Sequence, residues 1–163
     1  MMRKNPIVQL IFLMKGIMLN MDIMLLNDLA KLPVRGSEQA AGWDLHAATE
    51  GNIIIPPHCT VKIGTGLAMA IPNGFFGGIF PRSGIASKRG LRPANCVGVI
   101  DSDYRGEIIV ALHNDSNQCE IIENGERIAQ LIILPYEKID SFNIVEKLDA
   151  TERGAGGFGS TGI

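Results

Sequence analysis

Short apolar runs follow one another along the chain from Met21 onward. They are rich in Ile and Val and are separated by Gly, Pro and Asn, and no window keeps an apolar period of 3.6 residues over three helical turns. Many short strands at this spacing are typical of a β-sandwich or barrel, so the pattern predicts an all-β domain. The predicted strands are Asp22–Leu26, Trp43–Ala47, Asn52–Ile55, Thr60–Leu67, Phe75–Phe80, Asn95–Ile100, Glu107–His113, Cys119–Ile122, Arg127–Leu134 and Asn143–Glu146.

One segment, Ser83–Arg89, favours a short helix. Ser83 is placed to cap its first turn, and Gly90 is placed to end it. The sequence contains neither an internal repeat nor a linker before the C-terminal tail. The predicted organisation is an N-terminal extension of uncertain order over residues 1–20, a β domain over residues 21–150 and a glycine-rich arm over residues 151–163.

The first twenty residues differ in character from the rest of the chain. Basic residues there are not opposed by acidic ones, and residues 7–19 are mostly apolar, which partly resembles a signal peptide. However, Lys15 interrupts the apolar run, no small-x-small cleavage site follows, and the run is too short to cross a bilayer as a helix. We therefore interpret the segment as an extension or as the product of an upstream translation start, with Met18 or Met21 beginning the domain proper.

Composition narrows the class of ligand. With 163 residues, of which 46% are hydrophobic, the chain is long enough for one domain with a substantial core. A net charge of -2 and a pI near 5.9 give no general attraction to nucleic acid, so phosphate recognition must come from a few placed cations and favours a small ligand. Cys59, Cys96 and Cys119 form no CxxC pair and have no histidine cluster beside them, which indicates neither disulfides nor zinc and favours a reducing compartment.

The C-terminal tail, residues 153–162, combines five glycines with side chains suited to a nucleotide. Arg153 offers a planar set of donors for phosphate, and Phe158 offers a face on which a ring can stack. The backbone of residues 159–161 can present N–H groups to an anion. The tail is therefore interpreted as a flap that closes on a nucleotide, although its composition alone also fits a frayed terminus without function.

Two further segments carry polar groups among small or apolar residues. Asp44 lies near the start of a strand, where an ionised carboxylate needs a partner, and either a metal-bound water or a nearby arginine would serve. Residues 81–84, Pro-Arg-Ser-Gly, open the predicted helix and bring N–H groups, a hydroxyl and a guanidinium together as an anion site, unless they are only an ordinary helix cap.

Residues 95–107 predict a β-hairpin whose turn holds acidic residues. Asp101 is placed to accept a hydrogen bond from a water or a sugar hydroxyl, and Tyr104 is placed to wall a pocket; the alternative is that both only shape and pack the turn. Gln130 lies in an otherwise apolar strand, so its amide must hydrogen-bond to a ligand phosphate or to neighbouring backbone.

In this order, the segments AGWDLHAA, PRSG, GVIDSDYRGE, GERIAQLI and RGAGGFGSTG resemble the five motifs of the trimeric deoxyuridine triphosphate nucleotidohydrolase (dUTPase) family, from about Met21 to Ile163. The resemblance implies a jelly-roll-like β-sandwich or barrel with one short helix, assembled as a homotrimer in which the C-terminal arm of one chain closes over a site built by the other two. It implies hydrolysis of dUTP to dUMP and pyrophosphate by Mg²⁺-assisted attack of water on the α-phosphorus. That activity limits uracil incorporation into DNA and supplies dUMP for dTMP synthesis.

The resemblance also assigns roles to the predicted hairpin. Asp101 matches the residue that orients and activates the attacking water and contacts the 3′-hydroxyl of the deoxyribose. Tyr104 matches the tyrosine that packs on the sugar and leaves no room for a 2′-hydroxyl. The positions that match the reading of uracil are Asn95 and the backbone of Val99, Ile100 and Ile109.

The remaining matches concern the triphosphate. Asp44 matches the carboxylate that reaches Mg²⁺ through water, the metal being held mainly by the three phosphates. The matched triphosphate contacts are Arg82, Ser83, Gly84 and Gln130. In the arm, the matches are Arg153 for the γ-phosphate, Phe158 for the face of uracil, and Gly159, Ser160 and Thr161 for the loop around the phosphates.

The family resemblance leaves three rival functions to weigh. A deoxycytidine triphosphate deaminase would need its own catalytic carboxylate and would not carry this Tyr104 turn together with this arm. A non-catalytic nucleotide-sensing or protein-interaction module would be expected to lose Asp101 or the arm. A purely structural trimer leaves Arg153 and Phe158 unexplained. The expected partners are dUTP and two further copies of the chain, without nucleic acid or membrane, in the cytoplasm, or in the nucleus for a eukaryotic or viral source; secretion is not expected.

Overall fold

Antiparallel strands make up almost all of the regular structure in the computed structural model, which describes residues 20–157. The elements are β1 (Asp22–Leu25), β2 (Trp43–His46), β3 (Ile53–Ile55), β4 (Thr60–Gly64), β5 (Leu67–Ala70), β6 (Phe75–Phe80), α2 (Ser83–Arg89), β7 (Leu91–Pro93), β8 (Gly98–Ile100), β9 (Ile109–Asn114), β10 (Glu120–Ile122) and β11 (Arg127–Pro135). The predicted all-β fold with a short helix is confirmed. No helix in this part of the chain is long and apolar enough to span a membrane.

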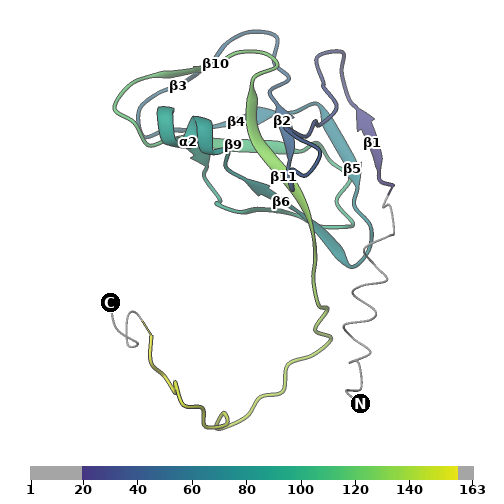
Figure 1. The fold of residues 1–163 in the computed structure, drawn as a ribbon, viewed down its shortest axis with the longest axis vertical. Helices are drawn as coiled ribbons and strands as arrows, with labels where there is room; N and C mark the ends of the chain where they lie inside the picture. The colour runs from purple at the N-terminus through teal and green to yellow at the C-terminus, as the bar shows by residue number, and fades with distance from the viewer. Residues whose placement is uncertain (1–19, 158–163) are drawn as a thin grey trace.

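Two sheets supply most of the pairing. One has the strand order β2-β11-β6-β8, and the other has the order β4-β9-β7 (Figure 1). Two smaller sheets, β1-β5 and β10-β3, lie at their margins. The long strand β11 pairs with β2 on one side and with β6 on the other, so three of the predicted motif segments are held together by one strand and its neighbours.

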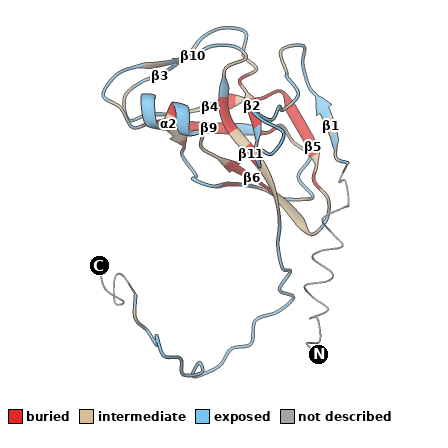
Figure 2. Ribbon diagram, in the orientation of Figure 1, coloured by how far each residue is buried: buried red, intermediate tan, exposed pale blue. Residues whose placement is uncertain are grey.

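The hydrophobic core lies between these sheets. Strand β9 shows why, because its alternate residues Val110, Leu112 and Asn114 are buried and those between them are more exposed. Figure 2 shows buried positions gathered on β2, β5, β6, β9 and β11, whereas the segment after residue 135 is almost wholly exposed. The most completely buried apolar side chains are Leu45, Ile55, Ile63, Leu67, Leu91, Ile108, Val110, Leu112, Ile122, Ile128 and Leu131.

Asn114 is a fully buried polar residue in this core, and we expect its loss to destabilise the fold strongly. Its side chain is fully buried; Nδ2 donates to the carbonyls of Ile55 at 3.0 Å and Gln118 at 2.7 Å, and Oδ1 accepts from the Ser116 N–H at 2.9 Å. Asn114→Ala leaves these buried groups without partners and should lower the free energy of unfolding by about 3 kcal/mol, measured by urea denaturation. The exposed Asn117→Ala is the control, with an expected loss below about 1 kcal/mol; equal losses would contradict this account.

One predicted strand was wrong in its bounds, and one observed strand was not predicted. Within the predicted strand Thr60–Leu67, β4 ends at Gly64 and a separate strand, β5, begins at Leu67, because Gly66 has a φ of 66° and the Thr65 hydroxyl donates to the carbonyl of Ile108 at 2.7 Å. Strand β7 was missed because it has only three residues and ends in a proline.

A third prediction, the strand Asn143–Glu146, was wrong altogether. The described residues after Pro135 form no strand, and the segment extends away from the domain (Figure 1). Ile144 is fully exposed and Phe142 is 85% exposed, so neither has a sheet to pack on within one chain. A strand is stable only beside a partner edge, which this segment lacks here.

The helix prediction was right in its bounds and wrong in its first cap. Helix α2 spans Ser83–Arg89, and Gly90 ends it with a φ of 67° and an N–H directed to the Ala86 carbonyl. The N-cap residue, however, is Arg82, which makes no side-chain capping bond, and Ser83 is already the first helical residue.

The last turn of α2 is fixed by an ion-pair cluster. Nε of Arg89 donates to Glu120 at 2.5 Å, another guanidinium nitrogen donates to Glu126, and Nη2 donates to the Ile121 carbonyl at 2.6 Å. Burial alone would lower the pKa of Arg89, but the hydrogen bond to Glu120 and the charges of both glutamates outweigh burial and raise this pKa. The cluster holds α2, and therefore residues 82–84 before and within it, against β10 and the turn before β11.

The predicted hairpin over residues 95–107 does not form as a paired hairpin. Strand β8 pairs with β6, whereas β9 pairs with β4 and β7, so the intervening turn crosses from one sheet to the other. The crossing is secured by Ile108, whose N–H donates to the Leu67 carbonyl and whose carbonyl accepts from Thr65. Asp101 and Tyr104 thus lie on a connection between two layers.

Candidate functional site

Asp44 lies at the centre of a cluster with two arginines. It lies on β2 and is only 8% exposed. Its Oδ1 accepts from Nε of Arg82 at 2.7 Å, and its Oδ2 accepts from Nη2 of Arg82 at 3.3 Å and from Nη1 of Arg127 at 3.1 Å. Of the two partners that the sequence allowed for Asp44, the arginine pairing is the one observed in the structure.

Gln130 completes the same sheet face. Strand β11 places it between Asp44 on β2 and Phe80 on β6. Its Nε2 donates to the Pro81 carbonyl at 2.9 Å, and its Oε1 lies against Gly42, where a Cβ atom would come within 2.4 Å of that oxygen. Of the two partners that the sequence allowed for the Gln130 amide, backbone is the one observed. A side chain at position 42 would need the space that the Gln130 side chain occupies, so Gln130 would have to move.

Ser83 and Gly84 lie next to this cluster at the start of α2. Both are exposed, and open space surrounds the position of a Cβ atom on Gly84. The predicted phosphate contacts Arg82, Ser83, Gly84 and Gln130 are therefore brought together with Asp44. They combine guanidinium N–H groups, a hydroxyl and accessible backbone, which are suitable groups for binding an anion.

The second group of predicted residues surrounds Asp101. Asp101 is exposed directly after β8, and its carbonyl accepts from the Tyr104 N–H at 3.1 Å. The Tyr104 hydroxyl donates to the Glu107 carbonyl at 3.0 Å, and the ring lies on Gly106, where a Cβ atom would approach the Tyr104 hydroxyl oxygen to 2.4 Å. These contacts fix the turn and leave the Asp101 carboxylate facing solvent.

Asp101 borders an open depression of about 620 Å³. Its lining is mostly polar and comes from the turn after β8, the connection before β6 and the residue after β11. The lining residues are Ile71, Asn73, Asp101, Ser102, Asp103, Arg105 and Tyr136. The nearby positions predicted to read uracil are also accessible, with Val99 58% exposed and Ile109 47% exposed. Asn95 is exposed beside Gly98. A Cβ atom added to Gly98 would lie 3.1 Å from the Asn95 amide nitrogen.

One chain does not bring these two groups together. Gln130, in the Asp44 cluster, pairs with Phe80 at the last position of β6, whereas Ile100, just before Asp101, pairs with Gly77 toward the start of that strand. The two groups therefore lie toward opposite ends of β6. Asp101 is exposed, whereas Asp44 is largely buried and is reached from solvent past its arginine partners.

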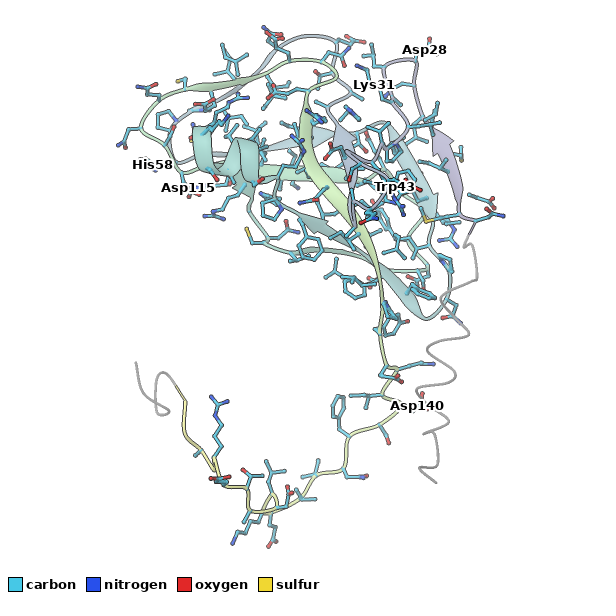
Figure 3. The ribbon with its side chains drawn as sticks, in the orientation of Figure 1. Asp28, Lys31, Trp43, His58, Asp115 and Asp140 are labelled. Carbon is cyan, nitrogen blue, oxygen red and sulfur yellow. The ribbon has the colours of Figure 1, made fainter. Side chains whose placement is uncertain are left out.

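The arm adds a third, separate part. Arg153 is exposed, and its Nε donates to the nearby Gly156 carbonyl at 2.9 Å. Figure 3 shows Asp140 on the segment that extends away from the domain, whereas Trp43 lies on the domain itself. The predicted contacts Phe158, Gly159, Ser160 and Thr161 lie outside the described residues.

Residues 20–157 do not form a metal site from their own side chains. No group of three or more His, Cys, Asp or Glu side chains is arranged to hold a metal ion there. Both oxygens of Asp44 already accept hydrogen bonds from arginines. This donor set fits a metal held mainly by a ligand's own phosphates, with protein contact through water, better than a metal held directly by the chain.

Two residues of this face were missed at the sequence level. Arg127 contacts Asp44 although 83 positions separate them, and His46 lies two residues after Asp44, opposite Arg127. Burial lowers the pKa of His46, and the Lys31 charge lowers it further, so the imidazole is neutral near pH 7; its buried Nδ1 has no hydrogen-bond partner among residues 20–157. The available signal was strand alternation, which puts residues 44 and 46 on one face.

A separate depression of about 630 Å³ lies beside Trp43. Among residues 20–157, Arg35 is its one charged lining residue, and the guanidinium stacks on the Trp43 ring at 4.5 Å from the centroid. The remaining lining is largely apolar and includes Leu32, Met69 and Leu131. Without a carboxylate it offers no acid–base chemistry, so the Asp44 and Asp101 groups are the candidate site.

Comparisons with known proteins show what the chain as a whole is similar to. The sequence profile of the dUTPase family matches residues 28–162. The deoxyuridine 5′-triphosphate nucleotidohydrolase of Desulfitobacterium hafniense is 50% identical over 134 residues, which cover 82% of this chain and 88% of the relative. The structure of the Staphylococcus bacteriophage 80alpha dUTPase with dUpNHpp has a TM-score of 0.77 and 28% identity, covering 88% of this chain and 99% of that one. A mutant dUTPase from phage phi11 of S. aureus, described with a structural Mg(II) ion, has a TM-score of 0.70 and 25% identity, covering 78% and 97%.

Proposed function

The chain belongs to the dUTPase family, and from this premise we propose that it is a dUTP diphosphatase that hydrolyses dUTP to dUMP and pyrophosphate. The observation that carries the proposal is the pair of sites just described: an exposed carboxylate on a fixed turn, and an arginine-rich cluster at a helix start. We further propose that the reaction limits uracil in DNA and supplies dUMP for dTMP synthesis in the cytoplasm, or in the nucleus for a eukaryotic or viral source.

The attacking water is assigned to Asp101. The carboxylate is exposed and fixed only through its backbone, so it is free to accept a proton from a water while that water attacks the α-phosphorus. The bond from the α-phosphorus to the bridging oxygen breaks, and pyrophosphate leaves. Attack at a phosphoryl centre needs positioning and charge neutralisation more than a covalent nucleophile, which matches the groups present.

Selectivity for a deoxyuridine nucleotide is assigned to the same turn. The Tyr104 ring is held by its own hydroxyl bond and by Gly106, so it forms a rigid wall that a 2′-hydroxyl would meet. Asn95 and the backbone of Val99, Ile100 and Ile109 are proposed to read the uracil edge, where cytosine has the wrong donor pattern and a thymine methyl group would clash.

The triphosphate is assigned to Arg82, Ser83, Gly84 and Gln130, with the arm residues Arg153, Phe158, Gly159, Ser160 and Thr161 closing over the nucleotide. Mg²⁺, when bound by the phosphates, neutralises charge on the triphosphate and on the leaving pyrophosphate. Asp44 would reach the metal through water, in keeping with its fully engaged oxygens. Closure of the arm would exclude bulk water from the site.

We propose that a homotrimer assembles the complete site. The Asp44 cluster and the Asp101 turn lie toward opposite ends of β6, and the segment that follows Tyr136 and leads to the arm extends away from its own domain. Neighbouring chains would therefore supply to one another what each lacks. The exposed apolar residues of that segment, such as Phe142 and Ile144, fit this assembly because a neighbour would cover them.

Substrate preference tests the function directly. We expect pyrophosphate release with Mg²⁺ to be at least about a hundredfold faster, in kcat/KM, on dUTP than on dCTP, dTTP or UTP, because unpaired polar groups and steric clashes reject each alternative. The measurement is a pyrophosphate-coupled assay run on all four nucleotides. Similar rates on all four would refute the assignment, and release of ammonia from dCTP would instead indicate a deaminase.

A further inference from the structure

Arg127 begins β11 and connects the Asp44 cluster to solvent. Its Nη1 donates to Oδ2 of Asp44 at 3.1 Å, while its side chain stays 51% exposed. The side chains of Asp44 and Arg82 are only 11% and 21% exposed. Arg127 is therefore the accessible partner of a carboxylate that is otherwise enclosed.

The acidic residue next to Arg127 in sequence is committed elsewhere. Glu126 accepts from Arg89 and from the Glu123 N–H, so its carboxylate is directed away from Arg127. Arg127 instead turns toward Asp44 across the β2–β11 pairing. The orientation of the Arg127 side chain is thus set by Asp44 and not by the neighbouring Glu126.

A count of charges shows what this arrangement achieves. Asp44 carries one negative charge, and Arg82 and Arg127 each carry one positive charge, so the cluster keeps one net positive charge. Without Arg127, the charge of Arg82 would be cancelled by Asp44. Arg82 would still be oriented, but the cluster would present no net charge to an anion.

We propose that Arg127 is a positioning residue for the triphosphate of the substrate. It shares the Asp44 carboxylate with Arg82, and so leaves the positive charge and the remaining N–H groups of Arg82 available to phosphate. This inference rests on the proposed function and adds to it a residue that acts through Asp44.

Replacement of Arg127 by a neutral side chain should weaken recognition of phosphate and spare recognition of the nucleoside. For Arg127→Gln we expect KM for dUTP to rise about tenfold, because one charge-assisted contact is lost. The inhibition constant of deoxyuridine, which lacks phosphate, should stay within about twofold, since its binding groups lie on the Asp101 turn. Arg127→Lys keeps the charge and should hold KM within about threefold of the wild type.

The controls separate this effect from general damage. Lys62→Gln removes one exposed positive charge from β4, in the other sheet, and should leave both constants unchanged. Arg127→Met is the second neutral variant if the glutamine form does not fold. An unchanged KM in a folded neutral variant, or an equal rise in KM and in the deoxyuridine constant, overturns the inference. Failure of the wild type itself to release pyrophosphate from dUTP would refute the proposed function instead.

Discussion

Asp101→Asn should lower kcat for dUTP by about 10³-fold, within the range that general-base groups contribute. Asparagine keeps the shape of the side chain but cannot take a proton from water. Asp101 is exposed and its backbone bond to Tyr104 does not involve the carboxylate, so the variant should fold normally. Binding of a non-hydrolysable imido analogue of dUTP should stay within about fivefold, as expected when a group acts mainly in the transition state.

Asp103→Asn is the matched control for this prediction. Asp103 lies in the same turn, borders the same depression and is also exposed, yet it is not assigned to the water. The control should keep kcat within about threefold of the wild type. Single-turnover and steady-state pyrophosphate release on both variants provides the measurement. Full activity of Asp101→Asn, or an equal loss in Asp103→Asn, would remove Asp101 from the proposed role.

Patterns that depend on neighbouring residues were predicted well from the sequence. Short apolar runs bounded by Gly, Pro and Asn identified β6, β9 and β11, and the bounds of α2 followed from Ser83 and Gly90. The errors arose where tertiary contacts decided the outcome. The break between β4 and β5 depends on the bond from Thr65 to Ile108, 43 positions away, which no local pattern reports.

The candidate site shows the same division between local and distant information. The sequence identified Asp44 and Gln130 as polar groups that need partners, because their surroundings are apolar. It did not decide between a ligand and a protein partner, since that choice depends on Arg82, 38 positions from Asp44, and on Arg127, 83 positions away. The pairing of β2 with β11 brings Arg127 close to Asp44. The pairing of β11 with β6 brings Arg82, which follows β6, to the same place.

Truncation after Ala150 should lower kcat/KM for dUTP by on the order of 10²-fold while leaving the domain folded. The last strand ends at Pro135, and the described residues beyond it make no strand with the domain, so we expect the truncated chain to keep its core. The truncation removes Arg153 and the rest of the arm. Lys147→Gln, which neutralises an exposed cation in the segment before the arm, is the control and should change kcat/KM by less than about twofold.

Mixed assemblies can show whether the arm acts on a neighbouring chain. Full-length Asp101→Asn chains keep the arm, and truncated chains keep Asp101, so each protein alone should be nearly inactive. If a site takes Asp101 from one chain and the arm from another, a random one-to-one mixture should restore activity to about a quarter of its sites, because each of two independent requirements is met half the time. The mixture is prepared by co-expression and checked for mass by analytical ultracentrifugation. Mixed trimers without recovered activity would mean that the arm closes on its own chain, and an unaffected rate in the truncated protein alone would remove the arm from the mechanism.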